Sequence, residues 1–504
     1  MKTKKILTLA CALALLIPGM TVGEPNVSND NLVLLPVPKD PTISFRIWFK
    51  VGSQNDPKGK EGLAELVASM LTEAATTKNS YEQILEKLYP LAAGYSNTME
   101  AEMTVISGRT HKDNLREYYP LLIDAILAPA FKQEDLDRLK SQAMNYLENT
   151  LRYSSDEELG KAVLYNDVFA GTPYGHITTG TIEAVKSITL DDVKEFYKKH
   201  YTRDNLVIGL GGGYEPALVE QLKLDLNKLP AGMAAEVPRP QPKPADGFHV
   251  TIVEKDAPAT AFSMGYPMNI LRGTKDWYAL AVANSWLGEH RNSSSHLYQV
   301  IREERGLNYG DYSYIEHYPG GGQRQLPPQN VGRRVQLFEI WIRPVPNETR
   351  HFSLRAALRE YKMLVENGMS QGDFDLTRNF LKKYVLNYAQ TTMERLGYAL
   401  DDKYYGIKGS HLEMFREMMD KLTVKEVNEA IKRHWQYGAM NIAVITKDAE
   451  SFQKALVEDA LSPMTYATPK SDHVMKEDVE IVKFPVKVKS ENIRIIPVTD
   501  LLVK

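Results

Sequence analysis

The sequence predicts an α+β fold made of two homologous α/β-sandwich lobes joined by a linker. Three observations carry this prediction. The chain has 504 residues, which is too long for one ordinary hydrophobic core. A proline-rich stretch divides it near the middle, and the two sides of that stretch resemble each other. Each side also mixes alternating strands with long amphipathic helices, which is typical of a sheet packed against helices. We expect lobes at residues 24–230 and 249–465.

The first 23 residues have the pattern of a secretory signal peptide. A basic start at residues 2–5 precedes an apolar run over residues 6–17, and Gly23 supplies the small residue before a cleavage site. The run is shorter than the roughly 20 residues of a spanning helix, which favours cleavage over an uncleaved anchor. Cys11, the only cysteine, lies inside this segment, so the mature chain has no thiol. We therefore expect an exported protein of a bacterial periplasm.

The charge balance argues against two classes of partner. The formal net charge is -3, and 25% of the residues are charged, with both signs interspersed. This pattern gives no electrostatic reason to expect nucleic acid or an anionic membrane as a partner.

The division near the middle is a stretch at residues 231–248 with four prolines and few large apolar residues, which indicates a semi-extended linker. On its two sides, residues 189–201 align with residues 423–435. Each segment starts with a threonine that can cap a helix, ends in a histidine followed by an aromatic residue, and precedes an apolar strand. An internal duplication of about 230 residues explains the match; independent convergence on a helix–strand pattern is the alternative.

The last part of the chain, residues 466–504, is charged and contains two strand-like segments, at residues 479–484 and 493–498. The alternation of these segments predicts an extended C-terminal tail that can add an edge strand.

Residues 52–72 predict a strand end, a turn and then a helix that begins near Gly62. Apolar residues recur on this helix at the spacing of a core-facing stripe. The opposite face carries Glu65, Ala68, Ser69 and Thr72.

This segment resembles the zinc-binding motif of the pitrilysin/insulinase-type peptidases, the inverzincins. The framing residues of the motif are present: Gly52, Ser53, Pro57, Gly62, Leu63, Ala64, Met70 and Leu71. In active members two histidines four positions apart hold zinc, and a glutamate beside the second histidine takes a proton from zinc-bound water. Glu65 replaces the first histidine, Ala68 the glutamate and Ser69 the second histidine. The resemblance thus implies a member without a zinc site.

The family's third zinc ligand is a glutamate on a later helix, and Glu158, ahead of the stretch at residues 169–175, is the best match. A solvated glutamate at a helix start is the alternative. We expect no metal in this chain, because one surviving carboxylate does not make a zinc site.

A second match lies at residues 294–310. The family has a helix ending in Arg-Glu-x-x-Gly-Leu-x-Tyr, and the resemblance implies that its Arg and Tyr bind the substrate backbone beside the zinc. Arg302 and Tyr309 occupy these positions, and both side chains are good donors to a carbonyl that gains negative charge. Taken alone, Arg302 and Arg305 also fit ordinary helix-terminal cations paired with nearby glutamates.

Two further segments resemble the family. Residues 94–104, which contain Asn97 and Thr98, are similar to the edge strand that pairs with substrate backbone; an internal strand of the sheet is the alternative. Gly320, Gly321 and Gly322 form either a loop that gates a cavity or a simple connection.

The resemblance implies two lobes that form half of a clamshell. It also implies pairing with a catalytic HxxEH-bearing homologous subunit that carries the zinc and cleaves peptides. Our first hypothesis is a non-catalytic subunit that is inactive alone and supplies Arg302 and Tyr309 to its partner. The second is a peptide-binding or structural protein without a peptidase partner. The third is a lone enzyme that uses Glu65 and Glu158 with an unfamiliar metal.

Overall fold

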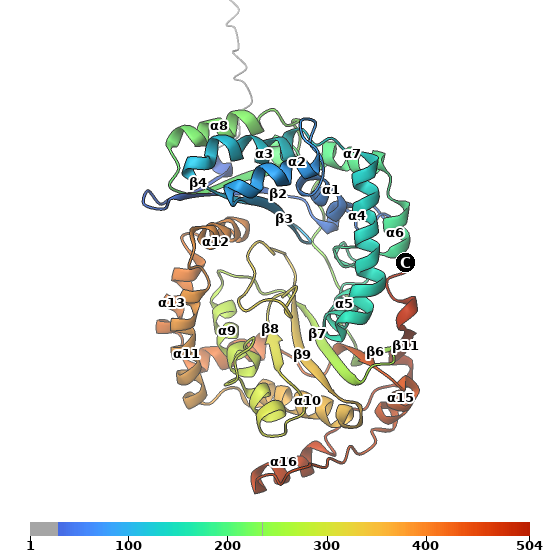
Figure 1. Ribbon diagram of the computed structural model, residues 1–504. Helices are drawn as coiled ribbons and strands as arrows, with labels where there is room; N and C mark the ends of the chain where they lie inside the picture. Colours follow the sequence, from blue (N-terminus) through green and yellow to red (C-terminus); the bar gives the residue numbers. More distant parts are fainter. Residues whose placement is uncertain (1–28, 234) are drawn as a thin grey trace, which may run out of the picture.

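Two mixed β-sheets organise the chain, one in each half of the molecule (Figure 1). The computed structural model describes residues 29–233 and 235–504; the predicted signal peptide lies outside the described residues. Within the described part, no helix combines the length and the apolar character that crossing a bilayer requires.

The first sheet has the strand order β1-β5-β2-β4-β3. β1 runs parallel to β5, and the other pairs are antiparallel. Its strands are β1 (Leu32–Pro36), β2 (Thr42–Phe49), β3 (Gly94–Met99), β4 (Thr104–His111) and β5 (Leu206–Gly212).

The second sheet repeats this arrangement strand for strand, in the order β11-β6-β10-β7-β9-β8. β6 is parallel to β10, as β1 is to β5, and β11 adds a further parallel strand at the edge. The strands are β6 (Phe248–Glu254), β7 (Ala259–Met268), β8 (Asp311–Tyr314), β9 (Gln336–Pro346), β10 (Met440–Thr446) and β11 (Ile493–Pro497). The repeated order supports duplication and argues against convergence, because convergence on one helix–strand unit would not reproduce a whole sheet.

The helices preceding β5 and β10 are the two segments that align in the sequence. Thr189 and Thr423 each cap their helix through a side-chain oxygen, and an acidic residue three positions later completes a capping box. The helices of the first half are α1 (Leu63–Thr72), α2 (Tyr81–Leu88), α3 (Leu115–Leu127), α4 (Gln133–Asn145), α5 (Asp156–Val168), α6 (Ile182–Ser187), α7 (Leu190–His200) and α8 (Pro216–Leu226). Those of the second half are α9 (Lys275–Gly288), α10 (Arg350–Asn367), α11 (Gln371–Tyr384), α12 (Thr392–Tyr405), α13 (His411–Lys421), α14 (Val424–His434), α15 (Ala449–Glu458) and α16 (Asp472–Ile481).

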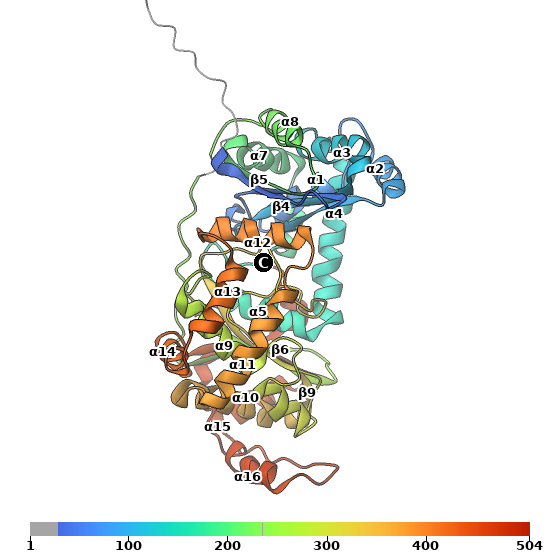
Figure 2. The same ribbon diagram turned by 90° about the vertical axis from the view of Figure 1, so that its left-hand side faces the viewer.

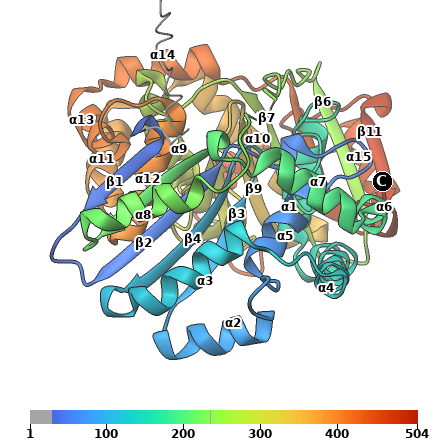
Figure 3. The ribbon, with the colours of Figure 1, turned by 90° about the horizontal axis from the view of Figure 1, so that it is seen from above.

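The two lobes exchange a helix. α5 belongs to the first half but packs on β7, β9 and β10 of the second sheet. α12 belongs to the second half but packs on β1, β2 and β5 of the first. Figures 1 and 2 show α12 beneath the first sheet, with α4 descending from the first lobe towards the second. Seen from above, α3 and α8 lie across the other face of the first sheet (Figure 3). The first sheet is therefore covered by helices on both faces.

The C-terminal segment departs from the predicted extended tail. The segment 479–484 is not a strand: its first three residues end α16 (Asp472–Ile481), because Ser471 caps this helix and Val474, Asp478 and Ile481 are buried at helical spacing. β11 then follows as an edge strand. The chain finally returns to the first lobe, where the carbonyl of Leu502 accepts a hydrogen bond from the Ile182 amide at 2.8 Å.

Candidate functional site

Helix α1 starts where the sequence places it, held by a carboxylate that precedes it. Asp56 accepts hydrogen bonds from the amides of Gly62 (2.8 Å) and Ala64 (2.7 Å), which satisfies amides that have no partner within the helix. Gly62 has φ +102, and a Cβ there would lie 2.6 Å from the carbonyl oxygen of Thr179. The turn thus requires glycine both for its backbone angle and for its space.

The face of α1 that replaces the zinc motif is packed rather than open. Ala68 is fully buried and belongs to the core of the first lobe, and Ser69 is 8% exposed. Only Glu65 retains partial access to solvent on this helix. Burial, together with the nearby carboxylates of Glu100 and Glu73, raises the pKa of Glu65 to about 7.

Returning the family's glutamate to this helix is expected to destabilise the protein. In an Ala68→Glu variant the new carboxylate enters the core without a cationic partner, which costs about 3–5 kcal/mol of unfolding free energy. Urea denaturation measures the loss. Gln142→Glu adds the same group at an exposed position of α4 and is expected to change the midpoint little. Equal stability of the two variants would contradict the buried placement of residue 68.

A cavity lies between the two halves of the chain. It encloses about 130 Å³ and is bounded by both halves of the chain. From the first half come Glu100, Tyr146, Glu158 and Lys161, and from the second His317, Gly320, Arg333 and Glu339. An adjoining space of about 750 Å³ shares Tyr146, Leu151, Glu158 and Gly320 with it. Burial and the charges of Glu158 and Glu65 raise the pKa of Tyr146. Of the two motif positions, Glu158 lines both spaces, whereas no residue of α1 lines either.

Charges in the cavity are largely neutralised by internal partners. The Arg333 Nη2 atom lies 3.2 Å from a carboxylate oxygen of Glu100, and Lys161 lies 3.7 Å from Glu339. Glu158 accepts a hydrogen bond of 3.0 Å from the amide of Gly322, so its carboxylate holds the glycine loop. The loop therefore lines the cavity as well as connecting two segments.

The described residues contain no group of three or more His, Cys, Asp or Glu side chains that could hold a metal ion. His290 and His296 have unrelated partners: His290 contacts the hydroxyl of Tyr314 at 2.8 Å, and His296 pairs with Glu360 at 2.7 Å. The carboxylates of Glu65 and Glu158 thus lack the further ligands that a catalytic zinc site needs.

Arg302 and Tyr309 lie side by side, with the guanidinium carbon 5.5 Å from the centre of the phenol ring. Tyr309 is 75% exposed. Within the described chain Arg302 forms no ion pair, and its Nε has no hydrogen-bond partner. Arg305 differs, since it pairs with Glu304, Glu477 and Asp478 at 3.0–3.2 Å. The interpretation as a paired helix-terminal cation therefore describes Arg305 and not Arg302.

The strand with Asn97 and Thr98 lies at an edge of the first sheet. Among residues 29–233 and 235–504, β3 pairs only with β4, so within the described sheet its other side has no partner strand and the internal-strand alternative is wrong. The Asn97 amide donates a hydrogen bond of 2.8 Å to the hydroxyl of Thr72. This bond ties the edge strand to the end of α1.

The network that joins the lobes has no signal in the sequence. Glu102, in the turn between β3 and β4, accepts hydrogen bonds from the Arg334 Nε at 2.9 Å and the Tyr404 hydroxyl at 2.7 Å. These three residues are far apart in the chain and follow no local spacing, so only the tertiary structure brings them together.

Comparisons with known proteins agree with this structure. The family "Insulinase (Peptidase family M16)" matches residues 32–182, and "Peptidase M16 inactive domain" matches residues 187–381. A "Non-peptidase homolog YmxG" of Helicobacter pylori is 26% identical over 412 residues, covering 80% of this chain and 88% of that protein. An "Uncharacterized zinc protease" of Rickettsia bellii is 24% identical over 82% of this chain and 94% of its own length.

Solved structures share the fold. The peptidase M16 inactive domain from Pseudomonas fluorescens has a TM-score of 0.71 at 24% identity, over 82% of this chain and 95% of that one. A chain of Complex III2 from Candida albicans has a TM-score of 0.65 at 16% identity, over 82% of this chain and 93% of that one. These likenesses confirm the predicted α+β fold of two lobes.

The predicted family is confirmed by the two family matches, which together span both lobes. Its zinc-binding histidines and catalytic glutamate are replaced on α1 by Glu65, Ala68 and Ser69. The chain therefore belongs to the insulinase (M16) peptidase family, as an inactive member that is not a peptidase on its own.

Proposed function

We propose that this protein is the non-catalytic, substrate-binding or regulatory subunit of a heterodimeric zinc peptidase in the bacterial periplasm. The partner is an HxxEH-bearing homologue that holds the zinc and cleaves peptides. One observation carries the proposal: the chain lacks the zinc motif but keeps Arg302 and Tyr309 as donors whose side chains have no ion pair or hydrogen bond within the part of the chain that the structure describes. Donors in this state are available to a carbonyl group in a partner's site.

The edge strand β3 supports a role in binding peptides. Its free side can add an extended peptide as a further strand, with main-chain hydrogen bonds giving affinity that does not depend on sequence. Asn97 and Thr98 lie on this strand next to α1. The N-terminal pattern of basic residues, apolar run and Gly23 supports export to the periplasm.

A structural role without a peptidase partner is the second candidate. The observation that favours it is the shared fold with a chain of Complex III2, together with the filled face of α1. In this case the protein would bind peptides or other subunits without contributing to catalysis.

Co-purification with a candidate HxxEH homologue tests the proposal. Peptide cleavage is measured for each protein alone and for the mixture, with zinc supplied throughout. We expect a stable complex and cleavage only in the mixture, because each chain carries one part of the site. Absence of a complex and of any gain in rate would overturn the proposal and leave the structural role.

A further inference from the structure

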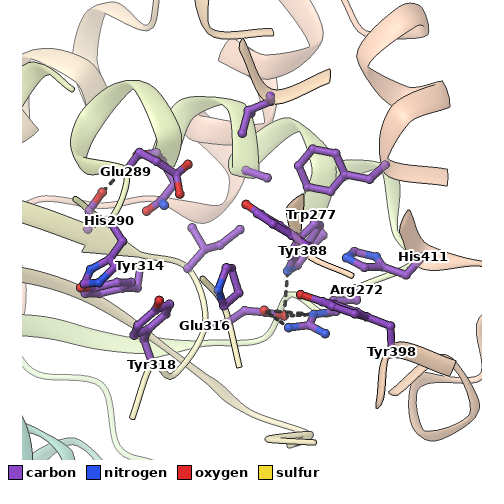
Figure 4. Close-up of a pocket in the computed structure, with 17 residues that line it drawn as sticks. Arg272, Trp277, Glu289, His290, Tyr314, Glu316, Tyr318, Tyr388, Tyr398 and His411 are labelled. Carbon is purple, nitrogen blue, oxygen red and sulfur yellow. Dashed lines mark hydrogen bonds and ion pairs between the residues drawn. The ribbon is translucent and has the colours of Figure 1, made fainter. Parts of the chain in front are cut away.

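A second cavity lies inside the second lobe, away from the inter-lobe cavity. It encloses about 80 Å³ between α9, the segment after β8 and the helices α11 to α13. Figure 4 shows that side chains from these elements surround it. Most of the larger ones are aromatic: Trp277, Tyr314, Tyr318, Tyr388, Tyr398 and Phe415.

One end of the cavity already holds a cation against aromatic rings. Arg272 contacts Glu316 at 2.8 Å and Asp401 at 3.2 Å. Its guanidinium carbon lies 5.8 Å from the ring centres of both Tyr398 and Tyr405. Two carboxylates and several aromatic rings surround this single guanidinium, so the charge of Arg272 is already compensated within the protein.

The other end has a carboxylate but no cation. Glu289 is buried and its side chain lines the cavity. Burial, and after it the charge of Glu289, raises the pKa of Tyr318, Tyr384 and Tyr388, and Tyr318 and Tyr388 line the same cavity as Glu289. No lysine or arginine in the part of the chain that the structure describes forms an ion pair with Glu289.

The two histidines of the cavity do not supply the missing charge. Burial lowers the pKa of His290 to about 4, and its ring nitrogens contact the Tyr314 hydroxyl at 2.8 Å and the Arg324 carbonyl at 2.9 Å. Burial also lowers the pKa of His411 well below its ordinary value. Both imidazoles are therefore neutral near pH 7. Burial raises the pKa of Glu289 itself to about 7, so its carboxyl group is about half ionised at that pH, and a bound cation favours the ionised form.

We propose that this cavity binds an organic cation, an ammonium or guanidinium group on a short alkyl chain, between the Glu289 carboxylate and the surrounding tyrosine rings. A buried carboxylate without a counter-ion attracts a cation, and aromatic faces stabilise the same charge. Anions are disfavoured by Glu289 itself. Since a single water needs about 10–15 Å³ of such space, a cavity of about 80 Å³ admits the end of one side chain and not a larger molecule.

Two sources share this chemistry: the lysine or arginine side chain of a peptide, and a small free alkylamine. Titration of the isolated mature chain, monitored by calorimetry, separates them. The probes are N-acetyl-lysine amide and n-butylammonium, and N-acetyl-norleucine amide is the neutral control of similar shape. We expect the lysine probe to bind at least about tenfold more tightly than the norleucine probe. Tighter binding of butylammonium than of the lysine probe would identify a free amine as the ligand.

Glu289→Gln preserves the shape of the side chain and removes its charge. It is expected to weaken binding of the cationic probe by about tenfold or more, while Glu303→Gln, at an exposed position, leaves the affinity unchanged. If the Glu289 variant does not fold, Tyr388→Leu removes one ring and is expected to weaken binding in the same direction. Unchanged affinity in these variants, or no preference for the cation by the wild-type chain, would overturn the proposal. Because no partner protein is added, its failure is distinguishable from failure of the proposed heterodimer.

Discussion

Replacing Arg302 with methionine is expected to lower kcat/KM of the complex with a catalytic partner by about 10²–10³-fold. The magnitude is typical of losing one hydrogen-bond donor to an oxyanion in a site that excludes water. Arg302 has no ion pair to lose within the described chain, so the variant is expected to fold and to assemble normally. Steady-state cleavage of a fluorogenic peptide by the purified complex measures the effect.

Two variants separate the proposed role from general damage. Tyr309→Phe removes only the hydroxyl from an exposed ring and is expected to reduce kcat more than it changes KM, because its hydrogen bond strengthens in the transition state. Tyr89→Phe alters a comparably exposed tyrosine of the first lobe (87% exposed) and is expected to have no effect. Wild-type turnover in both the Arg302 and the Tyr309 variants would refute the role assigned to this pair.

Local patterns in the sequence predict much of the fold. Thr189 and Thr423 mark two helices that begin with the same capping box and lead into equivalent strands. The match implied a repeated sheet, and the structure contains one. Patterns of this kind are readable because capping and periodicity depend on neighbours within a few residues. The prediction of a strand at residues 479–484 was wrong, because such a short run of alternating apolar residues fits a strand and a helix equally well.

The position of the candidate site was predictable from the sequence, but the packing of its side chains was not. The framing residues identified α1, and the replacements at positions 65, 68 and 69 predicted the loss of zinc. The spacing also placed Ala68 and Ser69 on the face opposite the core stripe, whereas both are buried. Burial on that face depends on tertiary packing around α1, which helical spacing does not describe. The pairing of Arg333 with Glu100 is equally invisible, because these residues come from different lobes.

The helix exchange predicts that neither lobe is an independent folding unit. The face of the first sheet that α12 covers carries a small apolar cluster with Trp48, Val105 and Val207 from the sheet and Leu396 and Leu400 from α12. Expression of residues 24–230 alone removes α12 and exposes this surface to water. An exposed apolar patch of this kind favours aggregation. We therefore expect the isolated first lobe to be insoluble or to bind hydrophobic dyes.

Co-expression of residues 24–230 with residues 231–504 as separate chains is the matched control, because it restores α12 while leaving the linker cut. We expect a soluble, co-purifying pair, since the lobes are held by the exchanged helices and by contacts such as Glu102 with Arg334 and Tyr404. A soluble isolated lobe with its own cooperative unfolding transition would contradict the expectation. The exchange also explains why a non-catalytic member would retain both lobes. Loss of either lobe uncovers a sheet of the other, so the surface that carries Arg302 and Tyr309 is stable only when both lobes are present.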